Sequence, residues 1–258
     1  MKRILYFLIS IALVLWFYVP SHATLIDYSN GTVMQARNDG STLMWLKDVN
    51  FSKTWGYDSD GLMSWVEANN WINYLNVTDF NSDGISGYAN YGDWRLPQVL
   101  PINGINYNFT YSPNGSTDRG YNITSPKSEL SYMYYVELGN IGYVDPSGIY
   151  PQIGWRSGWE LKNSGPFTID LASVPSTNGL FLTYPFWTGT EDPRYPSLAA
   201  WEFESNYGLQ YSEWETRSYY VWAVREVPVP EPATLLLLGS GLVVGMAVLR
   251  KRLGRRDG

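Results

Sequence analysis

Hydrophobic residues recur at helical spacing in only two stretches of the chain. The clearer stretch follows Ser64, where Glu67 stands three residues on and apolar side chains recur at positions 65, 68, 72 and 75. A serine with an acidic residue three positions later forms a capping box, so a helix is predicted over residues 64–76. A second helix is predicted from Ser125-Pro126 to Gly139, with apolar residues at 130, 133, 134 and 138 on one face.

Short segments elsewhere have the composition of strands, namely 43–46, 186–189, 200–205 and 219–226. Within one of them Trp201 and Phe203 alternate with Glu202 and Glu204, which predicts one apolar face and one acidic face turned to solvent. Two helices among short antiparallel strands and long aromatic-rich loops predict an α+β fold. No repeat or linker divides residues 24–227, so one domain is expected there.

An apolar run at the N-terminus predicts an export signal. Lys2 and Arg3 precede the apolar residues 4–19, and Ser21 and Ala23 then provide the small side chains of a cleavage site. This order is typical of a secretory signal peptide, which we assign to residues 1–23. A transmembrane anchor is the alternative.

The C-terminus has three parts in a fixed order. Pro230, Glu231 and Pro232 precede an apolar segment over residues 233–249, and Arg250-Lys251-Arg252 opens a basic end. As a helix the apolar segment would be about 25 Å long, barely enough to cross a bilayer, with its basic end on the cytoplasmic side. A plain single-span tail anchor is one interpretation.

The same order of parts over residues 228–258 resembles the PEP-CTERM sorting signal. The resemblance implies a Gram-negative bacterium that makes exopolysaccharide. It also implies a chain that is anchored transiently in the inner membrane as a transmembrane helix and is then cut by an exosortase. The product would reach the cell surface or the extracellular matrix.

Composition narrows the chemistry available to the mature chain. The 258 residues include no Cys and one His, His22, which lies in the predicted signal peptide. Thiolate nucleophiles, imidazole bases and metal sites built on Cys or His are therefore excluded. Residues 24–227 hold 11 basic and 22 acidic side chains, a charge near −11, which excludes sequence-independent binding of nucleic acid.

The domain over residues 24–227 resembles a known family through short strings in a constant order. The most specific strings are Asp93-Trp94-Arg95-Leu96-Pro97 and Trp222-Ala223-Val224-Arg225, with Phe186-Trp187-Thr188-Gly189 between them. They resemble the Lcl C-terminal-like domain, a domain of unknown function. The resemblance implies a C-type lectin-like fold and, as in members on bacterial surfaces, binding of polysaccharide or host matrix.

Exposed aromatic side chains in loops rich in Gly, Asn, Ser and Pro are the candidate ligand-binding residues. An aromatic face stacks on the C–H surface of a sugar, and polar neighbours bond its hydroxyls. The candidates are Trp155, Trp159, Tyr107, Tyr111 and Tyr121. The alternative is that these rings only cover a small core.

A second group of residues is predicted to be structural. Guanidinium groups inside apolar strings pair with carboxylates and bond loop carbonyls, which fixes how loops leave a sheet. The group consists of Asp93, Trp94, Arg95, Trp222 and Arg225.

Asp79, Asn81 and Asp83 stand at positions 1, 3 and 5 of a loop with Gly84 at position 6, the opening of a calcium loop. Position 12 is Asn90 rather than Glu, which argues against an EF-hand. Calcium is the candidate cation, and a polar turn without a cation is the alternative.

These features predict an exported, non-enzymatic protein of the cell envelope or extracellular matrix that binds polysaccharide or a surface protein. One alternative is a purely structural component of a matrix or biofilm without a discrete ligand. Another is a glycosidase that uses paired carboxylates, either Glu202 and Glu204 or Glu213 and Glu215.

Overall fold

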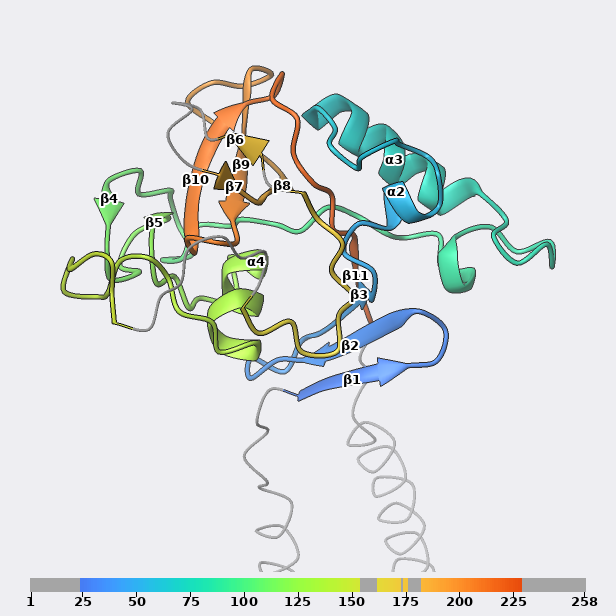
Figure 1. Cartoon of the computed structure of the whole chain (residues 1–258), viewed down its shortest axis with the longest axis horizontal. Helices are drawn as coiled ribbons and strands as arrows, with labels where there is room; N and C mark the ends of the chain where they lie inside the picture. The colour runs from blue at the N-terminus through green and yellow to red at the C-terminus, as the bar shows by residue number, and fades with distance from the viewer. Residues whose placement is uncertain (1–23, 154–161, 173, 176–181, 229–258) are drawn as a thin grey trace, which may run out of the picture. The chain divides into compact units, whose positions relative to one another are not determined.

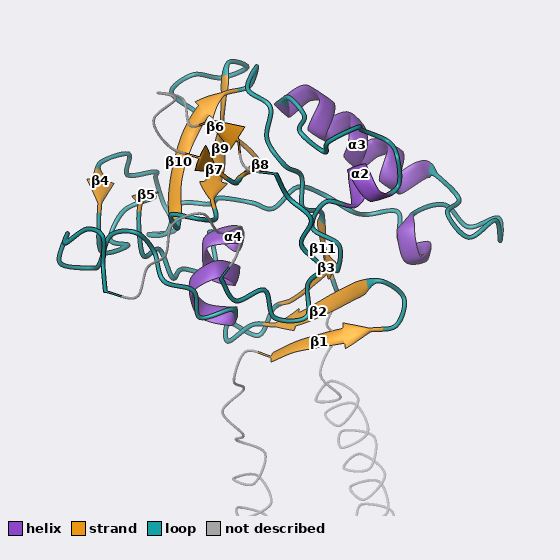
Figure 2. Cartoon of the chain, viewed as in Figure 1, coloured by secondary structure: helices purple, strands orange, loops and turns teal. Residues whose placement is uncertain are grey.

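Two β-sheets organise the domain (Figures 1 and 2). The computed structural model describes residues 24–153, 162–172, 174–175 and 182–228. Residues 1–226 form one compact unit and residues 227–258 a second. The predicted signal peptide and the predicted apolar span 233–249 both lie outside the described residues. Within the described ranges, no helix is long and apolar enough to cross a membrane.

The first sheet has four antiparallel strands. Its order is β1 (Thr24–Tyr28), β2 (Thr32–Ala36), β3 (Thr42–Leu46) and β11 (Val224–Glu226). The register places Val33 and Val224 on either side of Trp45, and all three side chains are fully buried. One face of this sheet therefore contributes a row of apolar residues to the core.

The second sheet has five strands in the order β4, β5, β10, β9 and β8. These are β4 (Tyr111–Ser112), β5 (Arg119–Gly120), β10 (Leu209–Trp214), β9 (Ala199–Glu204) and β8 (Pro185–Glu191). Only the β4–β5 pair is parallel, and the register shifts between Trp187 and Glu191 on β8. A separate short pair joins β6 (Val174–Pro175) to β7 (Leu182–Thr183).

The segment over residues 219–224 connects the two sheets. The Tyr220 N–H donates to the Pro185 carbonyl of β8, and the Leu46 N–H of β3 donates to the Ala223 carbonyl. The Trp222 indole N–H also donates to the Leu46 carbonyl at 2.8 Å. One strand was predicted over residues 219–226, but only Val224–Glu226, in β11, pair continuously with a neighbouring strand.

The predicted first helix is confirmed as α3 (Trp65–Val77), with Ser64 and Glu67 forming both halves of a capping box. It packs beside β8, where the Trp65 indole N–H donates to the Thr188 carbonyl. The short helix α2 (Phe51–Thr54) precedes it, and a 3₁₀ turn, η1 (Tyr88–Asn90), follows it.

The predicted second helix begins later than expected. The structure has α4 (Glu129–Tyr132), which continues as a π-helix, η2 (Met133–Glu137). Backbone pairing explains the late start, because the Leu100 N–H donates to the Lys127 carbonyl and the Glu129 N–H donates to the Gln98 carbonyl. Residues 127–129 are therefore paired with the 98–100 segment, and the helix does not begin before Glu129.

Aromatic side chains fill the space between the two sheets. The Trp222 ring centroid lies 4.8 Å from Trp45 and 4.6 Å from Phe167. Two buried indole N–H groups have acceptors, since Trp45 donates to Gln35 and Trp187 donates to the Met63 carbonyl. Within the described residues the indole N–H groups of Trp71 and Trp201 have none. Large rings with satisfied N–H groups allow short elements to build a stable core.

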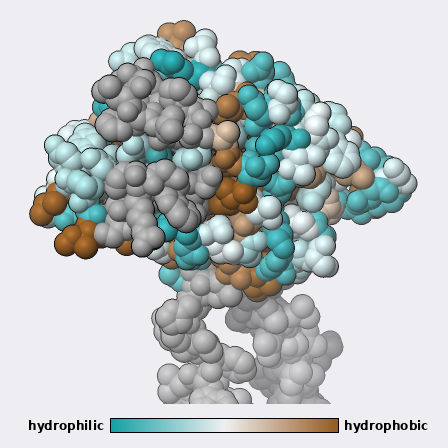
Figure 3. All heavy atoms as spheres, viewed as in Figure 1, coloured by the Kyte–Doolittle hydropathy of each residue, from teal (hydrophilic) through white to brown (hydrophobic). Residues whose placement is uncertain are grey.

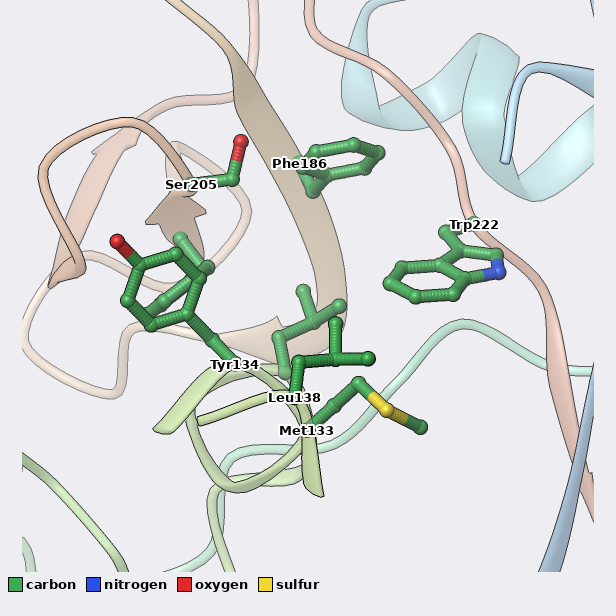
Figure 4. A pocket seen from close by; sticks show the side chains of 8 residues that line it. Met133, Tyr134, Leu138, Phe186, Ser205 and Trp222 are labelled. Carbon is green, nitrogen blue, oxygen red and sulfur yellow. The ribbon is translucent and has the colours of Figure 1, made fainter. Parts of the chain in front are cut away.

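A small cavity remains between α4–η2 and the strands β8 and β9 (Figure 4). Its volume is about 10 Å³, room for at most about one water molecule. Side chains of Met133, Leu138, Phe186 and Trp222 surround it. The cavity is a packing gap, too small for a sugar.

Candidate functional site

A continuous cluster of aromatic rings surrounds α2 and α3, and part of it reaches solvent. Trp55 is 45 % exposed and Tyr57 is 40 % exposed, while Tyr74 of α3 is half-buried. The Tyr57 and Tyr74 ring centroids are 5.0 Å apart. The Trp55 indole N–H donates to the Tyr74 hydroxyl at 3.4 Å. We call Trp55, Tyr57 and Tyr74 the aromatic platform.

Further rings support the aromatic platform from beneath. Tyr57 lies 4.8 Å from Trp71, which is fully buried. Trp55 lies 4.8 Å from Phe80, which in turn packs against Tyr88. Because each exposed ring rests on another ring, its rotation is restricted before any ligand arrives.

The loop that presents Tyr57 is held by a buried amide. The Asn50 side-chain N–H₂ donates to the carbonyls of Asp60 and Asp170. Gly61 follows with a φ of +82°, and a Cβ there would collide with the Asn50 side chain. Only glycine fits this close approach.

Sequence reasoning missed the aromatic platform, although a signal was present. The string Trp55-Gly56-Tyr57-Asp58-Ser59-Asp60-Gly61 is an aromatic, Gly-rich loop of the kind that was used to choose other candidates. Its position directly before a well-capped helix directed attention to the helix.

The predicted loop aromatics have different environments. Tyr111 is 52 % exposed. Tyr107 is half-buried, because its hydroxyl donates to the Val99 carbonyl and its ring stacks on Trp201 at 5.6 Å. Trp155 and Trp159 lie outside the described residues.

The expectation that Tyr121 is exposed is wrong. Only 7 % of its surface is accessible, and its ring meets Tyr111 edge-on at 6.1 Å. The Tyr121 N–H donates to the Ser112 carbonyl beside the β4–β5 pair, which turns the ring inward. Burial raises the pKa of its hydroxyl well above the usual value.

The candidate calcium loop is held in a turn by its own hydrogen bonds. Asp79 accepts backbone N–H groups from Asp83 and Gly84, and the Gly84 contact is the main reason that its pKa is lowered. Asn90 donates to Asp83 at 3.0 Å and accepts from Asn81 at 2.7 Å. Among the described residues, no three His, Cys, Asp or Glu side chains form a metal-binding group. Calcium binding at Asp79, Asn81 and Asp83 stays a prediction.

Two arginines hold the segment that contains Asp93 and Trp94. Arg95 forms a two-pronged ion pair with Glu129, with N–O distances of 2.7 and 2.8 Å. Arg225 pairs with Asp93 at 2.6 Å, and its guanidinium lies 4.0 Å from the Tyr91 ring centroid. These contacts tie residues 91–95 to α4 and β11.

The acidic face of β9 is buried, which corrects the expectation that it faces solvent. Glu202 is fully buried and Glu204 is 6 % exposed. Within the described part of the chain, neither carboxyl oxygen of Glu202 has a hydrogen-bond partner. The Tyr211 hydroxyl of β10 donates to Glu204 at 3.4 Å. Glu213, also on β10, is half-buried, and Glu215 follows that strand.

Burial keeps these two acids uncharged over part of the neutral pH range. Desolvation raises the pKa of Glu204 to about 7. It raises the pKa of Glu202 further, helped by the neighbouring charge of Glu204. A carboxyl that reaches no solvent cannot meet a polymer chain, so the geometry does not support hydrolysis by Glu202 and Glu204. Hydrolysis by the half-buried Glu213 and Glu215 is untested by this geometry.

The C-terminal region matches a known sorting motif. The PEP-CTERM protein-sorting motif covers residues 228–252, which include Pro230, Glu231 and Pro232. This is an exported, exosortase-sorted protein. Such a signal implies sorting at the membrane before processing.

The domain itself is assigned to no family by these comparisons. No family match supports the resemblance of residues 24–227 to the Lcl C-terminal-like domain. None of the curated proteins compared with the chain matches it.

Proposed function

We propose that the exported protein is a non-enzymatic component of the cell surface or extracellular matrix that binds polysaccharide or a surface protein. The sorting motif over residues 228–252 is the observation that carries this proposal, because it directs the chain to the exosortase route. An exosortase then releases the domain from its tail.

The described domain offers several exposed rings for such binding. Trp55, Tyr57 and Tyr111 are each at least 40 % exposed. Aromatic residues with restricted side chains lose little entropy when a ligand binds, which suits recognition of extended polymers. On the face shown in Figure 3, hydrophobic residues occur in separate patches between hydrophilic ones.

We propose further that residues 24–227 form a C-type lectin-like domain of the Lcl C-terminal-like kind. Mixed sheets with few helices support the α+β part of this assignment. The ion pairs of Arg95 and Arg225 hold the string that carried the resemblance. The non-enzymatic part is supported by Glu202, which is inaccessible to any substrate.

A glycan array probed with the exported protein tests the proposal. Saturable binding to discrete polysaccharides is the expected result. A blank array, together with no capture of surface proteins from the producing strain, would favour the purely structural alternative. Release of reducing ends from the strain's own exopolysaccharide would favour a glycosidase.

A further inference from the structure

We propose that the aromatic platform, Trp55, Tyr57 and Tyr74, is the polysaccharide-binding site and that it takes uncharged sugar rings. This inference rests on the proposed function and gives it a location and a ligand class. Four features of the described residues support it: ring exposure, ring support, free carboxamides and local charge.

The rings combine exposure with rigidity. Trp55 and Tyr57 are 45 % and 40 % exposed, and they pack on Phe80 and Trp71 respectively, each at 4.8 Å. Pyranose rings have apolar C–H faces of similar size, which pack on aromatic faces. Two adjacent exposed rings provide room for neighbouring sugars of one chain.

Polar groups stand next to the platform on α3. Asn70 and Asn73 are both exposed on α3. Asn70 stands four residues before Tyr74, which places it on the same face of the helix. In the part of the chain that the structure describes, neither carboxamide has a hydrogen-bond partner. A carboxamide both donates and accepts, which suits the hydroxyls around a sugar ring.

Charge around the platform decides between classes of polysaccharide. The acids Asp58, Asp60 and Glu67 lie on its own loop and helix, and Asp79 follows α3. The nearby cation Lys53 is already paired with Asp170 at 2.9 Å. Sulfated and uronate polymers would be repelled by this surface, whereas uncharged chains would not.

Hydropathy does not reveal this surface. The region of α2 and α3 is mostly pale and teal in Figure 3, because Trp and Tyr rank near the middle of the scale. The cluster becomes visible only when ring contacts and exposure are considered together.

The experiment measures binding of the exported protein to uncharged glucomannan, to anionic alginate and to cationic chitosan by affinity electrophoresis. The variants are Trp55→Ala and Tyr57→Ala. The matched control is Trp214→Ala, which removes an indole that is 48 % exposed on β10. Thermal melting confirms that each variant is folded.

We expect retardation by glucomannan, weakened about tenfold in each platform variant and unchanged in Trp214→Ala. Tyr57→Phe, which keeps the ring, should bind like the wild type. Stronger binding to alginate or to chitosan than to glucomannan would overturn the inference, as would platform variants that bind normally. If the wild type binds no polysaccharide and no surface protein, the proposed function itself fails.

Discussion

Glu202 shows that the burial of a single side chain, which its local sequence does not reveal, can affect the stability of the fold. The alternation along β9 predicted that Glu202 and Glu204 share a face, and they do. It could not predict burial, because whether that face meets water depends on chain segments far away in sequence. Two acids in a nearly dry environment should reduce the stability of the fold at neutral pH.

Stability should therefore fall as the pH rises. Between the ordinary Glu pKa of 4.5 and the folded value of about 7 for Glu204, the unfolded chain releases a proton that the folded chain retains. The free energy of unfolding decreases across this window, by about 3 kcal/mol for Glu204. Glu202, whose pKa is also raised, adds to the decline. Melting temperatures measured between pH 4.5 and 8 should show this decline.

Variants assign the effect to one carboxyl. Glu204→Gln should make the decline shallower and raise the melting temperature at pH 8, while buried Glu202 keeps part of the slope. Glu226→Gln alters a glutamate whose side chain is 75 % exposed and should leave the slope intact. A wild-type profile that is flat or rises toward pH 8 would show that these acids are not buried as described.

At the scale of elements, the Arg95–Glu129 pair links α4 to the loop before it. Arg95→Ala would leave Glu129, which is 5 % exposed, without its partner. We expect a loss of about 3–5 kcal/mol in the free energy of unfolding. Chemical denaturation of the variant gives this value directly.

The exposed Lys53–Asp170 ion pair provides a comparison for the cost of losing the buried Arg95–Glu129 pair. Lys53→Ala removes a cation whose side chain is 39 % exposed, and it should cost at most about 1 kcal/mol. Replacing both partners with Arg95→Met and Glu129→Leu should restore part of the loss. Equal costs for the two single variants would contradict a structural role for the buried pair.

The loop after α3 allows a calcium test. If Asp79, Asn81 and Asp83 bind calcium, millimolar calcium should raise the melting temperature relative to a chelator. Asp79→Ala and Asp83→Ala should abolish that rise. Asp145→Ala removes a carboxylate from another turn, where it accepts the Ser147 and Ile149 N–H groups. This control should preserve the rise, and identical wild-type curves with calcium and chelator would end the calcium hypothesis.

Local sequence signals predicted a helix well where neighbouring residues satisfy the hydrogen-bonding groups at its end. Ser64 and Glu67 complete each other's hydrogen bonds within one turn, so α3 was predictable. The start of α4 was not predictable from the sequence, because the backbone groups of residues 127–129 form hydrogen bonds with the distant 98–100 segment. The aromatic platform was also missed, since its rings come partly from the loop after α2 and partly from α3.

At the scale of the whole molecule, the sorting motif predicts a processed product. We expect cleavage near Pro230, Glu231 and Pro232, so the exported form should end upstream of Leu235. Mass spectrometry of the secreted protein measures this end. In a strain without the exosortase the full tail should persist, and an intact Arg255-Arg256 end on wild-type secreted material would contradict cleavage.

The segment that joins the two sheets is also the last part of the domain to be synthesised. β11 pairs with β3, and Trp222 donates to Leu46, so contacts between the two ends of the domain complete the fold. Such long-range closure cannot begin until residues 219–226 have crossed the membrane. By then the sorting motif that follows is arriving at the same membrane. If the chain crosses N-terminus first, the domain can therefore complete its fold only when the sorting motif has already reached the membrane.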